Sequence, residues 1–330
     1  MRPSVLVLAL SPPLLGSPAG ALDNTLGKRP GLGWNSDYCT NCSGPLSLQY
    51  GGASGVRAQG YGDEVFVKHI ADHMHTVKYG GKTLQELGFR YVNMDASWDL
   101  PERDAEGNLQ PDPKLWKQGL NHTVSYVHSL GLGFGLYGDR GTMDCARNPG
   151  QFGHEDQDGA WLGAHKIDWF KSDACYAADR NDKNKTEGQQ EAIALYRKMG
   201  KALNASGYPV WYALCGWMPF YAPYGKGLAN SARIGPDTGG GWTAVLQNLE
   251  NALPVSRDAG PTANGGYWND GSLQLTPGFG CHHGASITDP APADSCMTNA
   301  RFVSMYSIWT IMAFNLLLVG DFAKVLAVLV

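Results

Sequence analysis

The chain has 330 residues, 43% of them apolar, and a formal net charge of −4, values typical of a globular protein with a large core. There is no basic excess, which argues against nucleic acid as a partner because phosphate binding depends on clustered Lys and Arg. The apolar stretch at residues 314–330 carries Asp321 and Lys324 and is too short for a bilayer span. We therefore expect no membrane partner.

Residues 1–21 have the pattern of a signal peptide. Arg2 precedes an apolar core from Val5 to Leu15, and the small residues Ala19-Gly20-Ala21 end the segment. We expect a mature chain from about Leu22 and a secreted or lysosome-like destination. Four Asn-X-Ser/Thr sequons fit this route and are candidate glycosylation sites, at Asn41, Asn121, Asn184 and Asn204.

Short apolar runs alternate with amphipathic segments along the chain. The strand candidates are residues 31–36, 89–94, 132–137, 167–170, 209–214, 232–234, 267–270 and 314–319. The helix candidates are residues 63–87, 115–130, 156–166, 188–204, 243–253 and 299–313. This alternation predicts an α/β fold, a (β/α)8 TIM barrel spanning residues 22–330. An open doubly wound sheet is the alternative, but no Gly-X-Gly-X-X-Gly follows the first strand, and we expect no cofactor.

Carboxylates follow many of the strand candidates, at Asp95, Asp139, Asp173, Asp237, Asp270 and Asp321. The C-terminal strand ends of a parallel barrel face the active site, so these side chains should ring one mouth. Helix capping, or an ion pair of Asp173 with Lys171, is the structural alternative. Two carboxylates on opposing strands, here Asp173 and Asp237, are the minimum apparatus for cleaving a glycosidic bond. Aromatic rings suited to a sugar face sit at the same strand ends, at Trp34, Trp98, Trp217 and Trp268.

Five motifs occur in a fixed order along the chain: Leu32-Gly33-Trp34-Asn35-Ser36, Tyr91-Val92-Asn93-Met94-Asp95, Lys171-Ser172-Asp173, Arg233 to Asp237, and Trp268-Asn269-Asp270. Together they resemble glycoside hydrolase family 27, the α-galactosidase (melibiase) and α-N-acetylgalactosaminidase group. The resemblance runs from about Leu22 to Asp321. It implies a retaining mechanism in which Asp173 is the nucleophile and Asp237 the general acid/base.

The resemblance also implies which residues bind the sugar: Trp34, Asp95, Tyr137, Lys171, Trp217, Arg233 and Asp270. Lys171 is expected to contact a sugar hydroxyl and to keep Asp173 ionised by lowering its pKa. Asp237 has the opposite requirement, because it must hold a proton before donating it. The implied partner is a carbohydrate with a terminal α-linked sugar.

Seven cysteines in a secreted chain indicate disulfides and one free thiol. Cys145 and Cys175 resemble the family's disulfide beside the nucleophile, and Cys281 and Cys296 are expected to close the loop between them. Cys39 and Cys42 form a local pair or half of a metal site; without a second Cys or His pair at suitable spacing, we expect no metal. Cys215 is then the free thiol.

The chain departs from the family pattern at several places, among them Gly271-Ser272, where many members have Pro-Asp. Ala96 stands where the family has a second Asp after the second strand, and Gly216 stands where galactosidases have Glu, which suggests a roomier or differently contacted pocket. The family's C-terminal β-sandwich does not follow the barrel, so we expect a C-terminally truncated catalytic domain.

We predict that the protein is a secreted retaining α-glycosidase, an α-galactosidase. The alternatives are a relative specific for another terminal sugar and a catalytically degenerate barrel that binds glycans.

Overall fold

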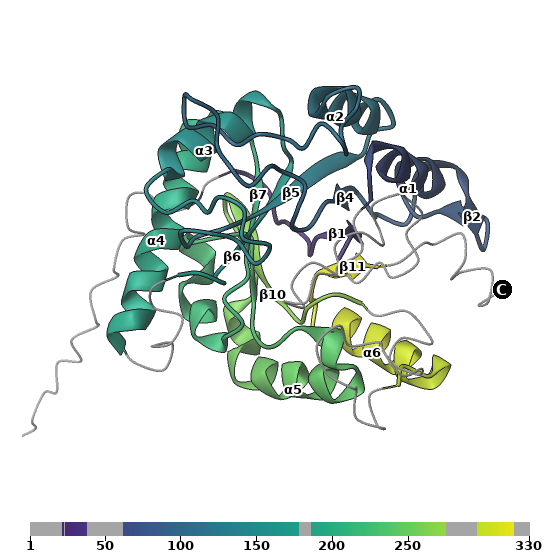
Figure 1. The fold of residues 1–330 in the computed structure, drawn as a ribbon. Helices are drawn as coiled ribbons and strands as arrows, with labels where there is room; N and C mark the ends of the chain where they lie inside the picture. The colour runs from purple at the N-terminus through teal and green to yellow at the C-terminus, as the bar shows by residue number, and fades with distance from the viewer. Residues whose placement is uncertain (1–21, 23, 38–61, 178–185, 275–295, 320–330) are drawn as a thin grey trace, which may run out of the picture.

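A strongly curled, mostly parallel sheet forms the centre of the protein (Figure 1). The computed structural model describes residues 22, 24–37, 62–177, 186–274 and 296–319. Within these residues one nine-stranded sheet has the order β11-β1-β4-β5-β6-β7-β8-β10-β9. Its strands are β1 (Leu32–Asn35), β4 (Tyr91–Asn93), β5 (Gly133–Asp139), β6 (Trp169–Asp173), β7 (Trp211–Leu214), β8 (Ser231–Arg233), β9 (Gly260–Thr262), β10 (Gly265–Asp270) and β11 (Leu316–Leu318).

All strand pairs in this sheet are parallel except β9 with β10, which form a hairpin. The two ends of the parallel set meet, because Gln274, just after β10, forms a parallel bridge with Leu318 of β11. The Gln274 amide donates to the Leu317 carbonyl at 2.9 Å. First and last strands of the chain also lie side by side, with Leu32 opposite Leu316. The sheet thus curls into the expected barrel.

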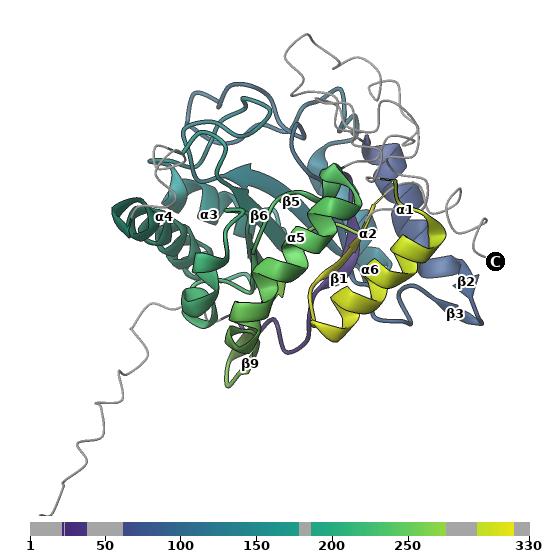
Figure 2. The same ribbon diagram turned by 90° about the horizontal axis from the view of Figure 1, so that it is seen from below.

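Helices cover the outer side of the curled sheet (Figures 1 and 2). They are α1 (Glu64–Thr76), α2 (Leu120–Ser129), α3 (Glu155–Ala164), α4 (Thr186–Ala205), α5 (Trp242–Ala252) and α6 (Asn299–Ile311). Among the described residues, 3-10 helices occupy connections at η2 (Pro219–Gly227), η3 (Thr238–Gly240) and η4 (Leu253–Asp258). None of the helices in the described ranges is both long and apolar enough to cross a membrane.

The predicted elements are largely confirmed, with one clear error. Every strand candidate overlaps an observed strand, but the helix expected at residues 63–87 ends at Thr76. A two-stranded hairpin follows it, formed by β2 (Lys78–Tyr79) and β3 (Lys82–Thr83). Gly80 and Gly81 form its turn with φ of 57° and 87°, a left-handed conformation that glycine adopts without a steric penalty. The signal-peptide segment, residues 1–21, lies outside the described residues.

An aromatic cluster fills the barrel interior at the N-terminal ends of the strands. The rings of Trp169 and Trp211 stack with centroids 4.8 Å apart, and Tyr91 lies 5.0 Å from Trp169. Gly31 is part of this packing, because a Cβ there would come within 2.5 Å of the Trp169 ring. The cluster closes the floor of the barrel and leaves polar side chains for the opposite end.

We predict that Trp211→Ala destabilises the protein by about 3–5 kcal/mol, because it removes a 3% exposed ring and leaves a cavity beside Trp169. The midpoint of chemical unfolding measures the effect. Leu253→Ala is the control, since Leu253 is 60% exposed and its loss should change stability by less than about 0.5 kcal/mol. Equal effects of the two substitutions would contradict the role given to the aromatic floor.

Candidate active site

Alternation along β6 directs Trp169, Lys171 and Asp173 into the barrel, while Phe170 and Ser172 face the helices. Lys171 Nζ donates to Asp95 Oδ2 at 2.8 Å and lies 5.0 Å from the centre of the Tyr137 ring. Asn35 Nδ2 donates to the same Asp95 oxygen at 3.1 Å. Strands β1, β4, β5 and β6 therefore supply one polar cluster at their C-terminal ends.

Burial lowers the pKa of Lys171, but the negative charges of Asp95 and other acidic neighbours outweigh burial and raise that pKa well above its ordinary value. Lys171 is therefore a permanent cation. It forms an ion pair with Asp95, a pairing that the sequence analysis did not predict.

Asp173 lies at the end of β6 and is 4% exposed. Its Oδ1 accepts from its neighbour Ala174 N at 2.9 Å, and its Oδ2 accepts from Tyr137 Oη at 3.2 Å. Burial raises the pKa of Asp173 to about 6; Lys171 opposes this shift and Asp237 adds to it. The lowered pKa expected for this carboxylate is thus wrong, because desolvation outweighs the attraction of Lys171.

The second half of the cluster comes from β8 and β10. Arg233 Nη1 donates to Asp237 Oδ1 at 2.5 Å, and Arg233 Nε lies 3.9 Å from Asp270 Oδ1. The Arg233 side chain is only 4% exposed, whereas that of Asp237 is 48% exposed. Asp270 is fixed by the amide of Ser272, which donates to Oδ1 at 2.7 Å. Asp237 thus offers an accessible carboxylate beside the buried one of Asp173.

Trp34 does not lie in this cluster, which corrects the prediction made for it. Its ring is completely buried and packs against Phe66 of α1, with centroids 5.8 Å apart. The reason is the two-residue period of the strand: Asn35 points into the barrel, so Trp34 must point outward. Trp98 is only 1% exposed, and Trp268 packs against the cluster of Trp169 and Trp211. Their indole N–H groups donate to the carbonyls of Tyr137 and Gly27.

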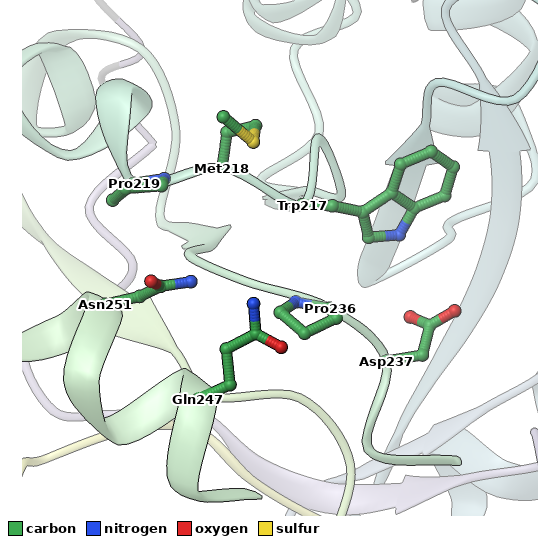
Figure 3. A pocket seen from close by; sticks show the side chains of 7 residues that line it. All are labelled: Trp217, Met218, Pro219, Pro236, Asp237, Gln247 and Asn251. Carbon is green, nitrogen blue, oxygen red and sulfur yellow. The ribbon is translucent and has the colours of Figure 1, made fainter. Parts of the chain in front are cut away.

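An open cleft of about 600 Å³ lies beside Asp237 (Figure 3). Trp217 lines this cleft and is half-buried, while its role in binding the sugar stays a prediction. The full lining is Trp217, Met218, Pro219, Pro236, Asp237, Gln247 and Asn251. Gly216 does not enlarge the site, because a Cβ there would come within 2.1 Å of the Tyr221 ring. The interpretation of Gly216 as a sign of a roomier pocket is therefore wrong: Tyr221 fills that space.

Two residues of the site escaped the sequence analysis. Asn35 is 2% exposed and donates to Asp95, and Asp37 is 4% exposed, with a pKa that burial and then Asp95 raise well above the ordinary value. Alternation from Gly33 along β1 would have placed both residues inside. Asp139 has a structural role, since its carboxylate accepts from the amides of Cys175 and Gly141 and holds the loop after β6.

The predicted disulfide between Cys145 and Cys175 is confirmed, with Cα atoms 5.1 Å apart. Cys145 Sγ lies 3.6 Å from Asp173 Oδ2, so the disulfide borders the buried carboxylate. Both sulfurs, with Asp139 and Asp173, lie within 4.8 Å of one another, but sulfurs bonded to each other are not thiolate ligands for a metal.

Cys215 is free and buried, as predicted. Cys296 is disulfide-bonded, while its expected partner Cys281 and the pair Cys39 and Cys42 lie outside the described residues.

Two of the sequons fall on helices that the structure describes. Asn121 is exposed on α2, and Asn204 is half-buried near the end of α4. Asn41 and Asn184, like the strand-end carboxylate Asp321, lie outside the described residues. Glycosylation at all four positions stays a prediction.

We predict that Asp173→Asn stabilises the protein at pH 7 more than at pH 4. The pKa of Asp173 is about 6 when folded and 3.8 in its reference state, so the folded carboxyl binds its proton more tightly. Ionisation of the buried Asp173 carboxyl lowers the free energy of unfolding. This cost is absent below about pH 4, grows as the pH rises through about 6, and reaches about 3 kcal/mol at neutral pH.

Melting temperatures of parent and variant across this pH range test the idea, with about 2–4 °C expected for each kcal/mol. Exposed Asp156 provides the control, because Asp156→Asn removes no buried charge and should change the melting temperature little. A variant no more stable than the parent at pH 7 would show that burial of Asp173 is not the dominant influence.

Comparison with known proteins agrees with this geometry. The model of the Alpha galactosidase A family (Melibiase_2) matches residues 58–328. An α-galactosidase of Cyamopsis tetragonoloba is 30% identical over 292 residues, covering 88% of this chain and 58% of the relative. An α-N-acetylgalactosaminidase of Gallus gallus is 30% identical over 247 residues, covering 72% of this chain and 54% of the relative.

The crystal structure of α-galactosidase I from Mortierella vinacea shares the fold, with a TM-score of 0.66 at 24% identity, covering 91% of this chain and 68% of that one. The chain spans little more than half the length of the plant and chicken relatives. The family match covers most of the sequence, and so the chain belongs to the α-galactosidase/melibiase family, glycoside hydrolase family 27.

Proposed function

We propose that this protein is a retaining α-glycosidase that removes terminal α-linked galactose from oligosaccharides or glycoconjugates. The observation that carries the proposal is the contrast between two carboxylates at one barrel mouth. Asp173 is buried and bordered by Lys171 and Tyr137, whereas Asp237 is half-exposed and held by Arg233. A nucleophile and an acid/base in a retaining glycosidase need such different surroundings.

In the first step, the ionised Asp173 attacks the anomeric carbon and forms an ester with the sugar. The glycosidic C–O bond breaks, and Asp237 gives its proton to the departing oxygen. Tyr137 and the Ala174 amide donate to Asp173, which favours its ionised form. They also fix the direction of its two oxygens.

In the second step, Asp237 accepts a proton from water as that water attacks the anomeric carbon. The bond to Asp173 breaks, the carboxylate is restored, and the sugar leaves with its original anomeric configuration. Because Asp237 gave its proton to the leaving oxygen in the first step, it is the carboxylate that this role as a base requires.

Galactose specificity rests on Asp95 and Lys171, whose ion pair faces the interior beside Asp173. Sugar hydroxyls can bond to both members of this pair. Ala96 offers no second carboxylate beside Asp95, which is the feature that favours a different terminal sugar. A panel of aryl α-glycosides tests the choice: the proposal requires faster hydrolysis of the galactoside than of the glucoside.

We also infer a secretory route for the protein. The disulfide between Cys145 and Cys175 supports it, since structural disulfides persist in oxidising compartments. Asn121 on the surface of α2 is then an accessible glycosylation site. Expression in cells with and without residues 1–21 tests the route, which requires the protein in the medium or in a lysosome-like compartment only when this segment is present.

The roles of the two carboxylates can be separated by azide rescue. We predict that Asp173→Ala abolishes turnover of an aryl α-galactoside, and that added azide then gives the inverted β-galactosyl azide by attacking from the vacated face. Asp237→Ala should retain activity on leaving groups that need no proton, and azide should then give the α-galactosyl azide through the covalent intermediate.

Nuclear magnetic resonance of the azide products measures both configurations. Asp156→Ala is the control, because Asp156 is exposed on α3 and should leave activity unchanged. Interchanged product configurations would reverse the two roles, and full activity in Asp173→Ala would refute the proposal.

A further inference from the structure

The backbone around Asp237 is held by buried side chains that the proposed chemistry does not use. Asp237 follows β8 on a segment that passes α5 (Figure 3), and its own side chain is 48% exposed. Exposed loops are usually the more mobile parts of a fold. Here the residues on both sides of Asp237 are bonded to the segment after β10, which begins at Asp270.

Asn248 of α5 forms the first tether. Its side chain is completely buried, and Nδ2 donates to the carbonyls of Pro236 and Gly271, both at 2.9 Å. Pro236 directly precedes Asp237, and Gly271 directly follows Asp270. One amide group therefore joins the backbones beside these two carboxylates.

The site of the Asn248 amide is closely fitted and energetically costly. Gly235 lies against it, and a Cβ there would come within 2.1 Å of Asn248 Oδ1, so only glycine leaves room for the amide. Asn248 Oδ1 is buried and has no hydrogen-bond partner among the described residues. Such an atom costs about 1–3 kcal/mol, which an apolar side chain would avoid. This cost indicates that the two bonds of Nδ2 serve more than stability.

Thr238 forms the second tether. Its side chain is buried, its Oγ1 donates to the Leu273 carbonyl at 2.8 Å, and its backbone N–H donates to Ser272 Oγ at 3.2 Å. The Ser272 amide in turn donates to Asp270 Oδ1 at 2.7 Å. The backbone of Asp237 is thus bound on both sides to the segment that fixes Asp270.

We propose that Asn248 and Thr238 are positioning residues for proton transfer by Asp237. The inference rests on the proposed function, because it takes Asp237 as the general acid/base. A general acid must lie within about 2.6–3.2 Å of the leaving oxygen, and a displacement of about 1 Å can cost about 100-fold in rate. Arg233 directs the carboxylate itself, whereas the two tethers fix the backbone from which it extends.

Loss of a tether should slow the substrates that need a proton. Thr238→Val replaces the hydroxyl by a methyl group, and Asn248→Ala removes the amide. In both variants we expect kcat/KM for methyl α-galactoside to fall about 10- to 100-fold. For α-galactosyl fluoride, kcat/KM should stay within about twofold, because fluoride leaves without full protonation. Thr238→Ser keeps the hydroxyl and should restore the parent's ratio of the two kcat/KM values.

Asn230→Ala is the matched control, because Asn230 is also a buried asparagine but lies at the N-terminal end of β8. It should lower the melting temperature without changing the ratio. An unchanged ratio in Thr238→Val and Asn248→Ala, whether both substrates are slowed equally or neither is, would overturn the proposal. If Asn248→Ala does not fold, the ratio in Thr238→Val decides. Failure of the parent protein to hydrolyse either substrate would refute the proposed function and the tethers' role with it, an outcome distinct from a changed variant.

Discussion

A buried ion pair between Lys171 and Asp95 connects β6 to the end of β4 across the mouth of the barrel. An isolated charge at such a site would carry a desolvation cost of several kcal/mol, so each group requires the other. Because acidic neighbours outweigh burial at Lys171, its pKa lies well above the ordinary value and it stays cationic throughout the working range of an enzyme. The charge of Lys171 lowers the pKa values of the neighbouring carboxyls Asp173 and Asp37 and so opposes the effect of their burial.

The most important of these carboxylates is Asp173, where two effects oppose each other. Burial raises the pKa to about 6, while Lys171 and the Ala174 amide lower it. Asp173 therefore ionises just below neutral pH, and only because the cation and the hydrogen bonds are present. In the proposed mechanism, a sugar neutralises this buried negative charge by forming an ester with Asp173. The buried, ionised carboxylate of Asp173 lowers the stability of the fold at the position where the proposed chemistry needs a reactive group. Such a compromise between stability and activity is common in active sites.

Much of this arrangement could be predicted from the sequence, because apolar strand runs ending in Asp or Lys mark the C-terminal face of a barrel. Asp95, Lys171, Asp173, Arg233 and Asp270 meet there as expected. Trp34 was misplaced because a motif fixes neighbours in sequence, whereas the strand period decides which of them faces inward. Trp34 packs on α1, and Asn35 takes the inward position, beside Asp95.

Other features depend on contacts between distant residues, which sequence patterns do not contain. Tyr221 fills the space beside Gly216, so the absence of a side chain there makes no hole. The pKa of Asp173 was predicted in the wrong direction because burial cannot be read from its neighbours in the chain. The cleft beside Asp237 arises where the segment after β7 approaches α5, two elements that share no sequence motif.

The central claim is that Asp173 becomes covalently bonded to the sugar during turnover. The most direct measurement is mass spectrometry of the protein after reaction with 5-fluoro-α-galactosyl fluoride, in which the ring fluorine slows breakdown of the ester more than its formation. We predict a mass increase of one fluorogalactosyl group, found after proteolysis on the peptide that contains Asp173 and absent in Asp173→Asn. A label on Asp237, or hydrolysis of the reagent without any covalent label and with inversion of the anomeric centre, would contradict the account.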